Sequence, residues 1–346
     1  MREQGRKVKD ANGVETHQPG WCKSVKAIGW FIEEYGVAQV SMNLTDEAQT
    51  PIHTAFDACV KSAYERGMRV TGSELVGLIP LQSMLNAGKY FLAKQKRSAG
   101  VSEAELVRIA IKSLGLDELA PFNPSERIIE YLIKGKQQNL LVEKSLTSFA
   151  DETASESPAP GGGSISAYVG ALGVSLGTMV ANLSSHKKGW DERWEFFSNW
   201  AERGQEIKEK LLKAVDEDTH AFNEIMNAFS LPKSTDAEKA ARTEAIQAAT
   251  KNAIQVPYHV MQLANESFGV LKAMAEEGNP NSVSDAGVGA LCARTAVYGA
   301  YLNVKINSAS LKDELYKNEV LANAEKILKQ ALESESEILK VVKAKL

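Results

Sequence analysis

The sequence predicts an α+β protein in which a small α/β part, a sheet with helices, is followed by an all-α helical bundle. β-rich runs with alternating polarity occur only near the N-terminus, and the apolar segments beyond about residue 100 have helical spacing. A length of 346 residues fits two domains of ordinary size. We therefore expect domains over residues 1–135 and 140–346, with a boundary in the charged and amide-rich stretch 134–139.

The first domain is expected to contain a hairpin, a helix and a strand. Residues 24–45 hold two β-rich runs around a Glu-Glu-Tyr-Gly turn, which predicts the hairpin. Pro51 is placed to start a helix that ends at Gly67, because proline is favoured at the first helical position and glycine just past the last. Residues 69–79 have the pattern of a strand that leads through Pro80 into further helices.

The second domain is expected to be helical throughout. Its most apolar window, 165–183, is long enough to cross a membrane, but it is rich in Ala, Gly and Ser with few Leu or Ile, so we interpret it as a buried helix. The segments with helical spacing are 102–114, 139–154, 164–185, 191–229, 236–276, 284–308 and 310–344.

Composition and charge exclude several classes of partner. A net charge of −4 provides no long-range positive field to attract nucleic acid or an anionic membrane. The three cysteines, Cys22, Cys59 and Cys292, are an odd number and far apart, which indicates reduced thiols. The sequence has no Cys-x-x-Cys or His-Glu-x-x-His motif, so no metal site is predicted. The N-terminus lacks the apolar core of a secretory signal, and we expect a cytoplasmic protein.

Three consecutive glycines, Gly161, Gly162 and Gly163, stand directly before Ser164 and a long apolar run. No Cβ shields the backbone N–H groups of such a loop, and the helix dipole that begins there favours an anion or the polar edge of a ligand. The loop lacks the lysine and the spacing of a P-loop, so its phosphate signal is weak.

The helix that follows the glycines has one face with almost no side chains. Such a face favours close packing of another helix, and the alternative is space for a flat ligand. The face consists of Ser166, Gly170, Gly173, Gly177 and Ala181.

Asp218 interrupts an apolar helical stripe. An ionised, unpaired carboxylate is costly to bury, so this group must be paired, protonated or beside a wet cavity. A functional carboxylate and a structural one paired with a Lys or Arg of a neighbouring helix are both open at this point. Asp216 and His220 lie on other faces and are expected to be solvated. The stripe runs through Leu211, Val215, position 218, Phe222, Ile225 and Phe229.

A second mixed face opens at Asp285. Because Asp285 follows Ser284 where an N-cap and a first-turn acid would stand anyway, it has a structural explanation. Asn303 and Asn307 need hydrogen-bond partners, either from a ligand or from another helix. The face comprises Asp285, Gly289, Cys292, Ala296, Gly299, Asn303 and Asn307.

Lys187 and Lys188 precede a cluster of aromatic residues, Trp190, Trp194 and Phe197. Stacking of a ligand ring is one interpretation. Core or subunit packing is the favoured alternative for the aromatic residues, with the lysines in a solvated loop.

From Ser145 onward the sequence resembles the formiminotetrahydrofolate cyclodeaminase domain, which some methenyltetrahydrofolate cyclohydrolases share. The matching pieces are PAPGGGS, VDEDTHAF, the segment Leu231–Pro257 with Arg242, NSVSD and YLNVKIN. The front, with IGWFIEEYGVAQVSMNLTD, VTGSELVGLIPL and PFNPSERIIEYL, resembles the C-terminal subdomain of glutamate formiminotransferase. The chain therefore looks like the back portion of a formiminotransferase-cyclodeaminase.

The resemblance implies a folate-dependent ammonia-lyase of histidine degradation that closes 5-formimino-tetrahydrofolate to 5,10-methenyl-tetrahydrofolate. A tetrahydrofolate derivative, with polyglutamylated forms among the candidates, would be substrate, and no metal is implied. Methenyltetrahydrofolate cyclohydrolase activity is the first alternative, and a non-catalytic assembly module for a separate transferase subunit is the second. Ring-like homo-oligomers are also implied, and Trp190, Trp194 and Phe197 are expected to contribute a contact surface.

The resemblance also suggests roles for particular residues. Closure requires the attacking nitrogen to lose a proton and the departing amine to gain one, which a carboxylate with a raised pKa can do in turn. Asp218 is the first candidate for this catalytic role and Asp285 the second. The expected substrate-binding residues are Gly161, Gly162, Gly163, Ser164, Lys187, Lys188, Arg242, Asn303 and Asn307.

The front of the chain departs from the transferase family. The N-terminal subdomain that carries the transferase histidine in that family has no counterpart here, so none of the five histidines takes over this role. Glutamate formiminotransferase activity is accordingly not expected from this chain alone.

Overall fold

The computed structural model describes residues 3–9, 11–134 and 140–346. The chain divides into two compact units: residues 1–95 with 102–136 form unit 1, and residues 96–101 with 137–346 form unit 2. The strands lie in unit 1 and the regular elements among the described residues of unit 2 are all helices, which confirms the predicted α+β class. The expected boundary at 134–139 falls largely on 135–139, which lie outside the described residues.

Unit 1 contains two antiparallel hairpins in place of a single sheet. Strands β3 (Val25–Ile32) and β4 (Val37–Leu44) form the hairpin that the sequence predicts, with Val25 opposite Leu44. Strands β1 (Arg6–Lys9) and β2 (Glu15–Gln18) form a second hairpin, whose mostly exposed side chains gave no apolar alternation to predict it from.

The helices of unit 1 enclose a small core in which Met84, Ala87 and Ala110 are fully buried. The predicted strand 69–79 is wrong: this segment is irregular, with a single bridge between Ile79 and Ile128. No neighbouring strand of the described residues pairs with the rest of it, and Val76 is 86% exposed. The helices are α1 (Ile52–Tyr64), α2 (Leu81–Lys94), α3 (Glu103–Leu114), α4 (Pro124–Arg127) and α5 (Ile129–Lys134).

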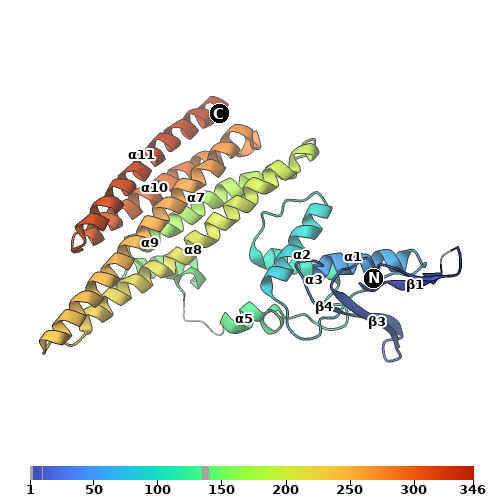
Figure 1. Cartoon of the computed structure of the whole chain (residues 1–346). Helices are drawn as coiled ribbons and strands as arrows, with labels where there is room; N and C mark the ends of the chain where they lie inside the picture. Colours follow the sequence, from blue (N-terminus) through green and yellow to red (C-terminus); the bar gives the residue numbers. More distant parts are fainter. Residues whose placement is uncertain (1–2, 10, 135–139) are drawn as a thin grey trace. The chain divides into compact units, whose positions relative to one another are not determined.

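Unit 2 is a bundle of long helices that lie side by side (Figure 1). The helix α9 begins with a capping box in which Thr235 and Glu238 bond each other's backbone, and Asp313 caps α11. Its elements are α6 (Leu146–Thr153), α7 (Gly162–Ser185), α8 (Trp194–Ser230), α9 (Asp236–Glu277), α10 (Val283–Ser308) and α11 (Glu314–Lys345), with short 3₁₀ turns at Leu141–Glu143, Asp191–Arg193 and Pro280–Ser282.

Helix α7 is central to unit 2 and packs against α8, α9 and α10. Its length and hydropathy would suit a membrane span, but 61% of its most apolar window is buried by other parts of the protein. A Cβ on Gly173 would lie 2.9 Å from the Cβ of Cys292 and from the carbonyl oxygen of Gly289, both on α10. The small face of α7 is therefore filled by neighbouring helices, which confirms the packing interpretation and leaves no space there for a flat ring.

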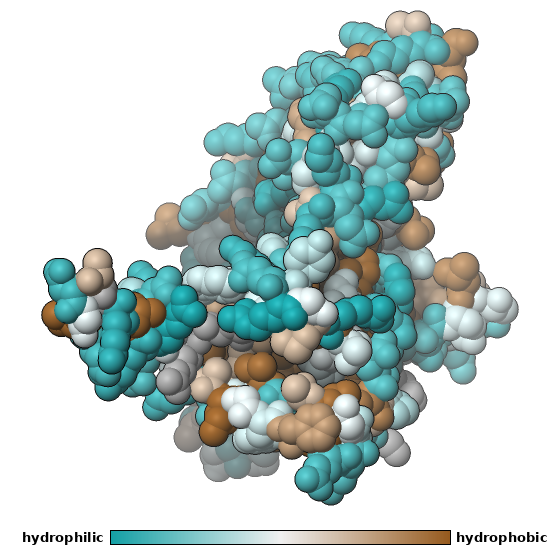
Figure 2. All heavy atoms as spheres, turned by 90° about the vertical axis from the view of Figure 1, so that its right-hand side faces the viewer, coloured by the Kyte–Doolittle hydropathy of each residue, from teal (hydrophilic) through white to brown (hydrophobic). Residues whose placement is uncertain are grey.

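Several apolar side chains remain at the surface, where Figure 2 shows them among mostly hydrophilic neighbours. They do not include Phe197, which is fully buried and stacks on Trp190 at 5.4 Å between ring centroids. Phe197 therefore cannot contribute to the contact surface expected from Trp190, Trp194 and Phe197, whereas Trp190 and Trp194 are half-buried. On α10 the exposed apolar residues are Val288, Leu291, Tyr298, Leu302 and Ile306.

Candidate active site at the start of helix α7

The start of α7 binds the carboxyl group of Asp218 on α8. The backbone N–H of Ser164 donates to Oδ2 of Asp218 at 2.8 Å, and the Ser164 hydroxyl donates to the same oxygen at 2.9 Å. The glycines before Ser164 bring these donors close, because a helix begins at Gly162 and its first N–H groups have no partner in the preceding turn. Residues 54 positions apart in the sequence thus meet at one point.

The glycines themselves make the close approach possible. A Cβ on Gly163 would lie 2.1 Å from Oδ1 of Asp218, and a Cβ on Gly162 would lie 3.2 Å from Nδ2 of Asn303 on α10. Gly161 has more room, since its nearest contact would be 3.7 Å away. The glycine loop, Asp218 and Asn303 therefore form one cluster at the junction of α7, α8 and α10.

Burial raises the pKa of the Asp218 carboxyl above the ordinary value of an aspartate, and the two hydrogen bonds from Ser164 offset part of this rise. No ion pair of Asp218 occurs among the described residues, and no charged group contributes to its shift. The structural alternative, in which Asp218 pairs with a Lys or Arg, is therefore not found in the described part of the chain.

The apolar stripe around Asp218 is buried on one side of it only. Leu211 and Val215 lie in the core, whereas Phe222 and Phe229 are exposed, because α8 and α9 continue beyond the start of α7 (Figure 1). Asp218 thus stands where the core ends. The expectation that Asp216 is solvated is wrong: its Oδ1 accepts a hydrogen bond from the N–H of Leu141 at 2.7 Å and its Oδ2 is buried.

The structure separates Asp285 from this cluster. Asp285 lies in the first turn of α10, about 27 Å along the helix from Asn303. Sharing a helical face therefore does not bring the two residues together. This position agrees with the structural explanation, a first-turn acid at a helix N-terminus.

The other predicted polar residues have structural partners. Nδ2 of Asn303 donates to the carbonyl of Gly299 at 2.9 Å, and Nδ2 of Asn307 donates to the carbonyl of Ala253 on α9 at 2.7 Å. The Arg242 guanidinium donates to the carbonyl of Phe229 at 3.0 Å and 3.2 Å and so closes the turn between α8 and α9. Asn307 and Arg242 thus connect helices, and neither is shown in contact with Asp218.

Lys187 and Lys188 follow the opposite end of α7, roughly 35 Å along the helix from Ser164. The ammonium of Lys187 lies 4.1 Å from the centre of the Trp190 ring, and Lys188 is exposed. The structure does not bring either lysine to the Asp218 cluster within one chain.

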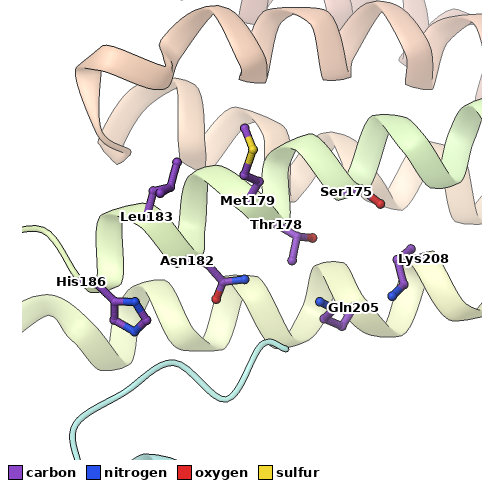
Figure 3. A pocket seen from close by; sticks show the side chains of 8 residues that line it. All are labelled: Ser175, Thr178, Met179, Asn182, Leu183, His186, Gln205 and Lys208. Carbon is purple, nitrogen blue, oxygen red and sulfur yellow. The ribbon is translucent and has the colours of Figure 1, made fainter. Parts of the chain in front are cut away.

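A pocket of about 350 Å³ lies farther along α7 and α8, away from the glycines (Figure 3). Asn182 and Gln205 each donate to the carbonyl of Gly100 there, at 2.8 Å and 3.1 Å. None of the predicted site residues lines this pocket. The sequence gives no signal for it, because its lining residues form no pattern that separates them from an ordinary helix surface. The lining consists of Ser175, Thr178, Met179, Asn182, Leu183, His186, Gln205 and Lys208.

The Asp218 cluster offers proton exchange and hydrogen bonding. The carboxyl can take up and release a proton, and the N–H groups at the start of α7 can hold an anionic or carbonyl oxygen. Among the described residues, no group of three or more His, Cys, Asp or Glu side chains is placed to hold a metal ion.

Unit 2 is thus a helical domain in which a partly buried carboxyl group, that of Asp218, lies at the start of α7. The family model described as formiminotransferase-cyclodeaminase matches residues 145–326, and the model of the formiminotransferase domain matches residues 1–134. The chain belongs to the formiminotransferase-cyclodeaminase family, which confirms the resemblance noted in the sequence.

Individual relatives cover different shares of the chain. The formimidoyltransferase-cyclodeaminase of Gallus gallus is 38% identical over 340 residues, 98% of this chain and 61% of that protein. The methenyltetrahydrofolate cyclohydrolase of Methylorubrum extorquens is 37% identical over 202 residues, 58% of this chain and 97% of that protein. The crystal structure of formiminotetrahydrofolate cyclodeaminase from Thermotoga maritima, 29% identical, superposes with a TM-score of 0.53 over 58% of this chain and 96% of that one. The chain thus spans about three fifths of the length of the first of these relatives.

Proposed function

We propose that unit 2 closes 5-formimino-tetrahydrofolate to 5,10-methenyl-tetrahydrofolate with release of ammonia, a reaction that would serve histidine degradation. The observation that carries the proposal is the Asp218 carboxyl, which is partly buried, bound by Ser164 and without an ion-pair partner among the described residues. Membership of the family and the similarity to the Thermotoga maritima cyclodeaminase support the class of reaction.

For this reaction the protein has to supply mainly orientation of the substrate and proton transfer. N10 of the substrate attacks the formimino carbon on N5, a new C–N bond forms, and the proton of N10 is released. The former imine nitrogen takes up that proton and one more from solvent, and its bond to carbon breaks to release ammonia and the methenyl cation. Because both reacting groups are in one molecule, much of the entropy of approach is already offset.

Asp218 suits the transfer of the first proton. A carboxyl whose pKa is raised by burial can accept the N10 proton and return it to the departing nitrogen. The N–H groups of Gly162 and Gly163 and the side chain of Asn303 would hold the polar edge of the folate beside it. Arg242 has no part in this proposal, because its guanidinium already bonds the carbonyl of Phe229.

Methenyltetrahydrofolate cyclohydrolase activity is the second candidate. It is favoured by one observation, that nearly the whole length of the Methylorubrum extorquens cyclohydrolase, 97%, matches 58% of this chain. Both reactions pass through a tetrahedral carbon between N5 and N10, so the same carboxyl could serve either.

One experiment separates these functions. Purified protein is incubated with 5-formimino-tetrahydrofolate while methenyl absorbance and ammonia are followed together, and in parallel with 5,10-methenyl-tetrahydrofolate while the loss of absorbance is followed. Equal appearance of methenyl product and ammonia supports the cyclodeaminase. Accelerated loss of methenyl absorbance alone supports the cyclohydrolase, and no acceleration in either reaction would leave only a non-catalytic assembly role. Formiminoglutamate with tetrahydrofolate, given to the same preparation, measures transferase activity.

A further inference from the structure

Ser164 holds the Asp218 carboxyl by a single oxygen. Its backbone N–H and its hydroxyl both donate to Oδ2, at 2.8 Å and 2.9 Å. Donors from one residue on one oxygen fix both the position and the rotation of a carboxyl group, because the second oxygen must then point in one direction. The two oxygens of Asp218 therefore differ in their surroundings.

The second oxygen, Oδ1, accepts no hydrogen bond from the described residues, although it lies against Gly163. A Cβ at position 163 would be 2.1 Å from it, so the glycine supplies the space that this oxygen occupies. Oδ1 retains the lone pairs that a proton exchange needs.

Ser164 itself is not available to a substrate. Its side chain is fully buried, with 0% exposure, and its hydroxyl oxygen also lies 3.5 Å from the hydroxyl of Thr219. The expectation from the sequence that Ser164 binds substrate is therefore replaced by a role that acts through Asp218.

We propose that Ser164 is a positioning residue that fixes Asp218 through Oδ2 and assigns proton exchange to Oδ1. This inference rests on the proposed function, since it specifies which atom of Asp218 reacts. It also has a consequence without any substrate. Both Ser164 bonds favour the ionised carboxyl and so offset part of the rise in pKa that burial causes. Removal of the hydroxyl should therefore move the titration of Asp218 to higher pH.

The test is a stability cycle of four proteins: wild type, Ser164→Ala, Asp218→Asn and the double variant. Their thermal midpoints are measured between about pH 4 and pH 9, and the difference that Asp218→Asn makes is plotted against pH in each Ser164 background. We expect the pH at the midpoint of this titration curve to be about one to two units higher in the Ala background, the shift that corresponds to one hydrogen bond to a charged group. The acidic limb of the pH profile of turnover should move to higher pH by the same amount.

Two further variants keep the test decisive. Ser164→Cys keeps a donor at the same position, with a somewhat larger atom and a weaker hydrogen bond. It should therefore shift the curve in the same direction by less, and it replaces the Ala variant if that protein does not fold. Ser166→Ala is the matched control, because the Ser166 hydroxyl donates to the carbonyl of Gly162 on the same helix, and it should leave the midpoint in place.

If the titration midpoint of Asp218 does not move in Ser164→Ala, or moves equally in Ser166→Ala, the positioning role is overturned even if Asp218→Asn is inactive. Conversely, a shifted midpoint with normal turnover of Asp218→Asn overturns the proposed catalysis and leaves Ser164 as the group that sets the titration of Asp218. The failures of the two proposals are thus distinguishable.

Discussion

The Asp218 carboxyl has hydrogen-bond donors but no ion-pair partner among the described residues, and this separates the two roles that its place in an apolar stripe leaves open. If Asp218 were a structural ion-pair partner, removing its charge would leave a buried cation unpaired and destabilise the fold. If Asp218 transfers a proton, removing its charge would instead lower the rate of the reaction.

We therefore expect Asp218→Asn to reduce turnover of 5-formimino-tetrahydrofolate by about 10²–10⁴-fold, the usual effect of losing a positioned general acid or base. The free energy of unfolding at neutral pH should change by less than about 1 kcal/mol, because the amide oxygen can still accept both Ser164 bonds. The pH dependence has a definite sign. Since the pKa of Asp218 is raised in the folded state, its contribution to stability is fully present below the pKa of the unfolded chain and is lost as pH rises through the folded pKa.

Turnover and thermal midpoint, measured on the same preparation across this range, check the prediction. A large fall in midpoint with near-normal turnover would end the catalytic interpretation of Asp218.

Gly163 provides a second test at the scale of one residue. Gly163→Ala places a Cβ on the Asp218 carboxyl, so we expect it to destabilise the protein by about 1–3 kcal/mol and to displace the carboxyl. Gly161→Ala is the matched control, because its added Cβ meets nothing closer than 3.7 Å and should change the free energy of unfolding by less than about 0.5 kcal/mol. Chemical denaturation of both variants measures the difference, and equal effects would contradict the close approach of Gly163 and Asp218.

At the scale of elements, the small residues of α7 decide how closely α10 can pack. Gly173 of α7 and Gly289 of α10 face each other, and a Cβ on Gly173 would lie 2.9 Å from the Gly289 carbonyl oxygen. This contact is between backbones, which cannot move aside as a flexible side chain can.

Gly173→Ala should therefore cost about 1–3 kcal/mol of stability despite the better helix propensity of alanine. Gly269→Ala in α9 is the control: the added Cβ would be 3.8 Å from the Trp200 ring, and we expect a gain of about 0.5–1 kcal/mol. Equilibrium unfolding in urea distinguishes the two signs, and stabilisation by Gly173→Ala would contradict the tight α7–α10 contact.

At the scale of the whole molecule, α10 leaves an apolar stripe exposed at Val288, Leu291, Tyr298 and Leu302. Their spacing of three, seven and four residues places them on one side of the helix, a pattern typical of helix association. Unpartnered apolar stripes of this kind mark contacts with other molecules, and homo-oligomers are the commonest case.

We predict that the protein self-associates at micromolar concentration and that Leu291→Lys lowers its mass in solution. Leu315→Lys on α11 replaces another exposed leucine and should leave the mass unchanged. Light scattering gives the masses, and circular dichroism shows whether the helices persist. A monomeric wild-type protein would refute the prediction.

Local sequence pattern is enough to predict most of the elements of this protein. Helical spacing located the long helices of unit 2, since periodicity depends only on neighbours in the chain. Asp218 and the glycines before Ser164 were recognisable for the same local reason: one is a charge in an apolar stripe, and the others are a loop without side chains. The strand expected over 69–79 failed because a strand needs a partner that local pattern cannot supply.

Which of these residues meet depends on how the helices pack in three dimensions. This packing joined Ser164 to Asp218 across 54 positions, while Asp285 and Asn303, which share a face, lie about 27 Å apart along α10. It also filled the small face of α7 with α10 and buried Phe197, where the sequence allowed a ligand or a subunit. The physical reason is that periodicity states which face of a helix is buried, whereas the packing of the other helices determines what covers it and at what height along the axis.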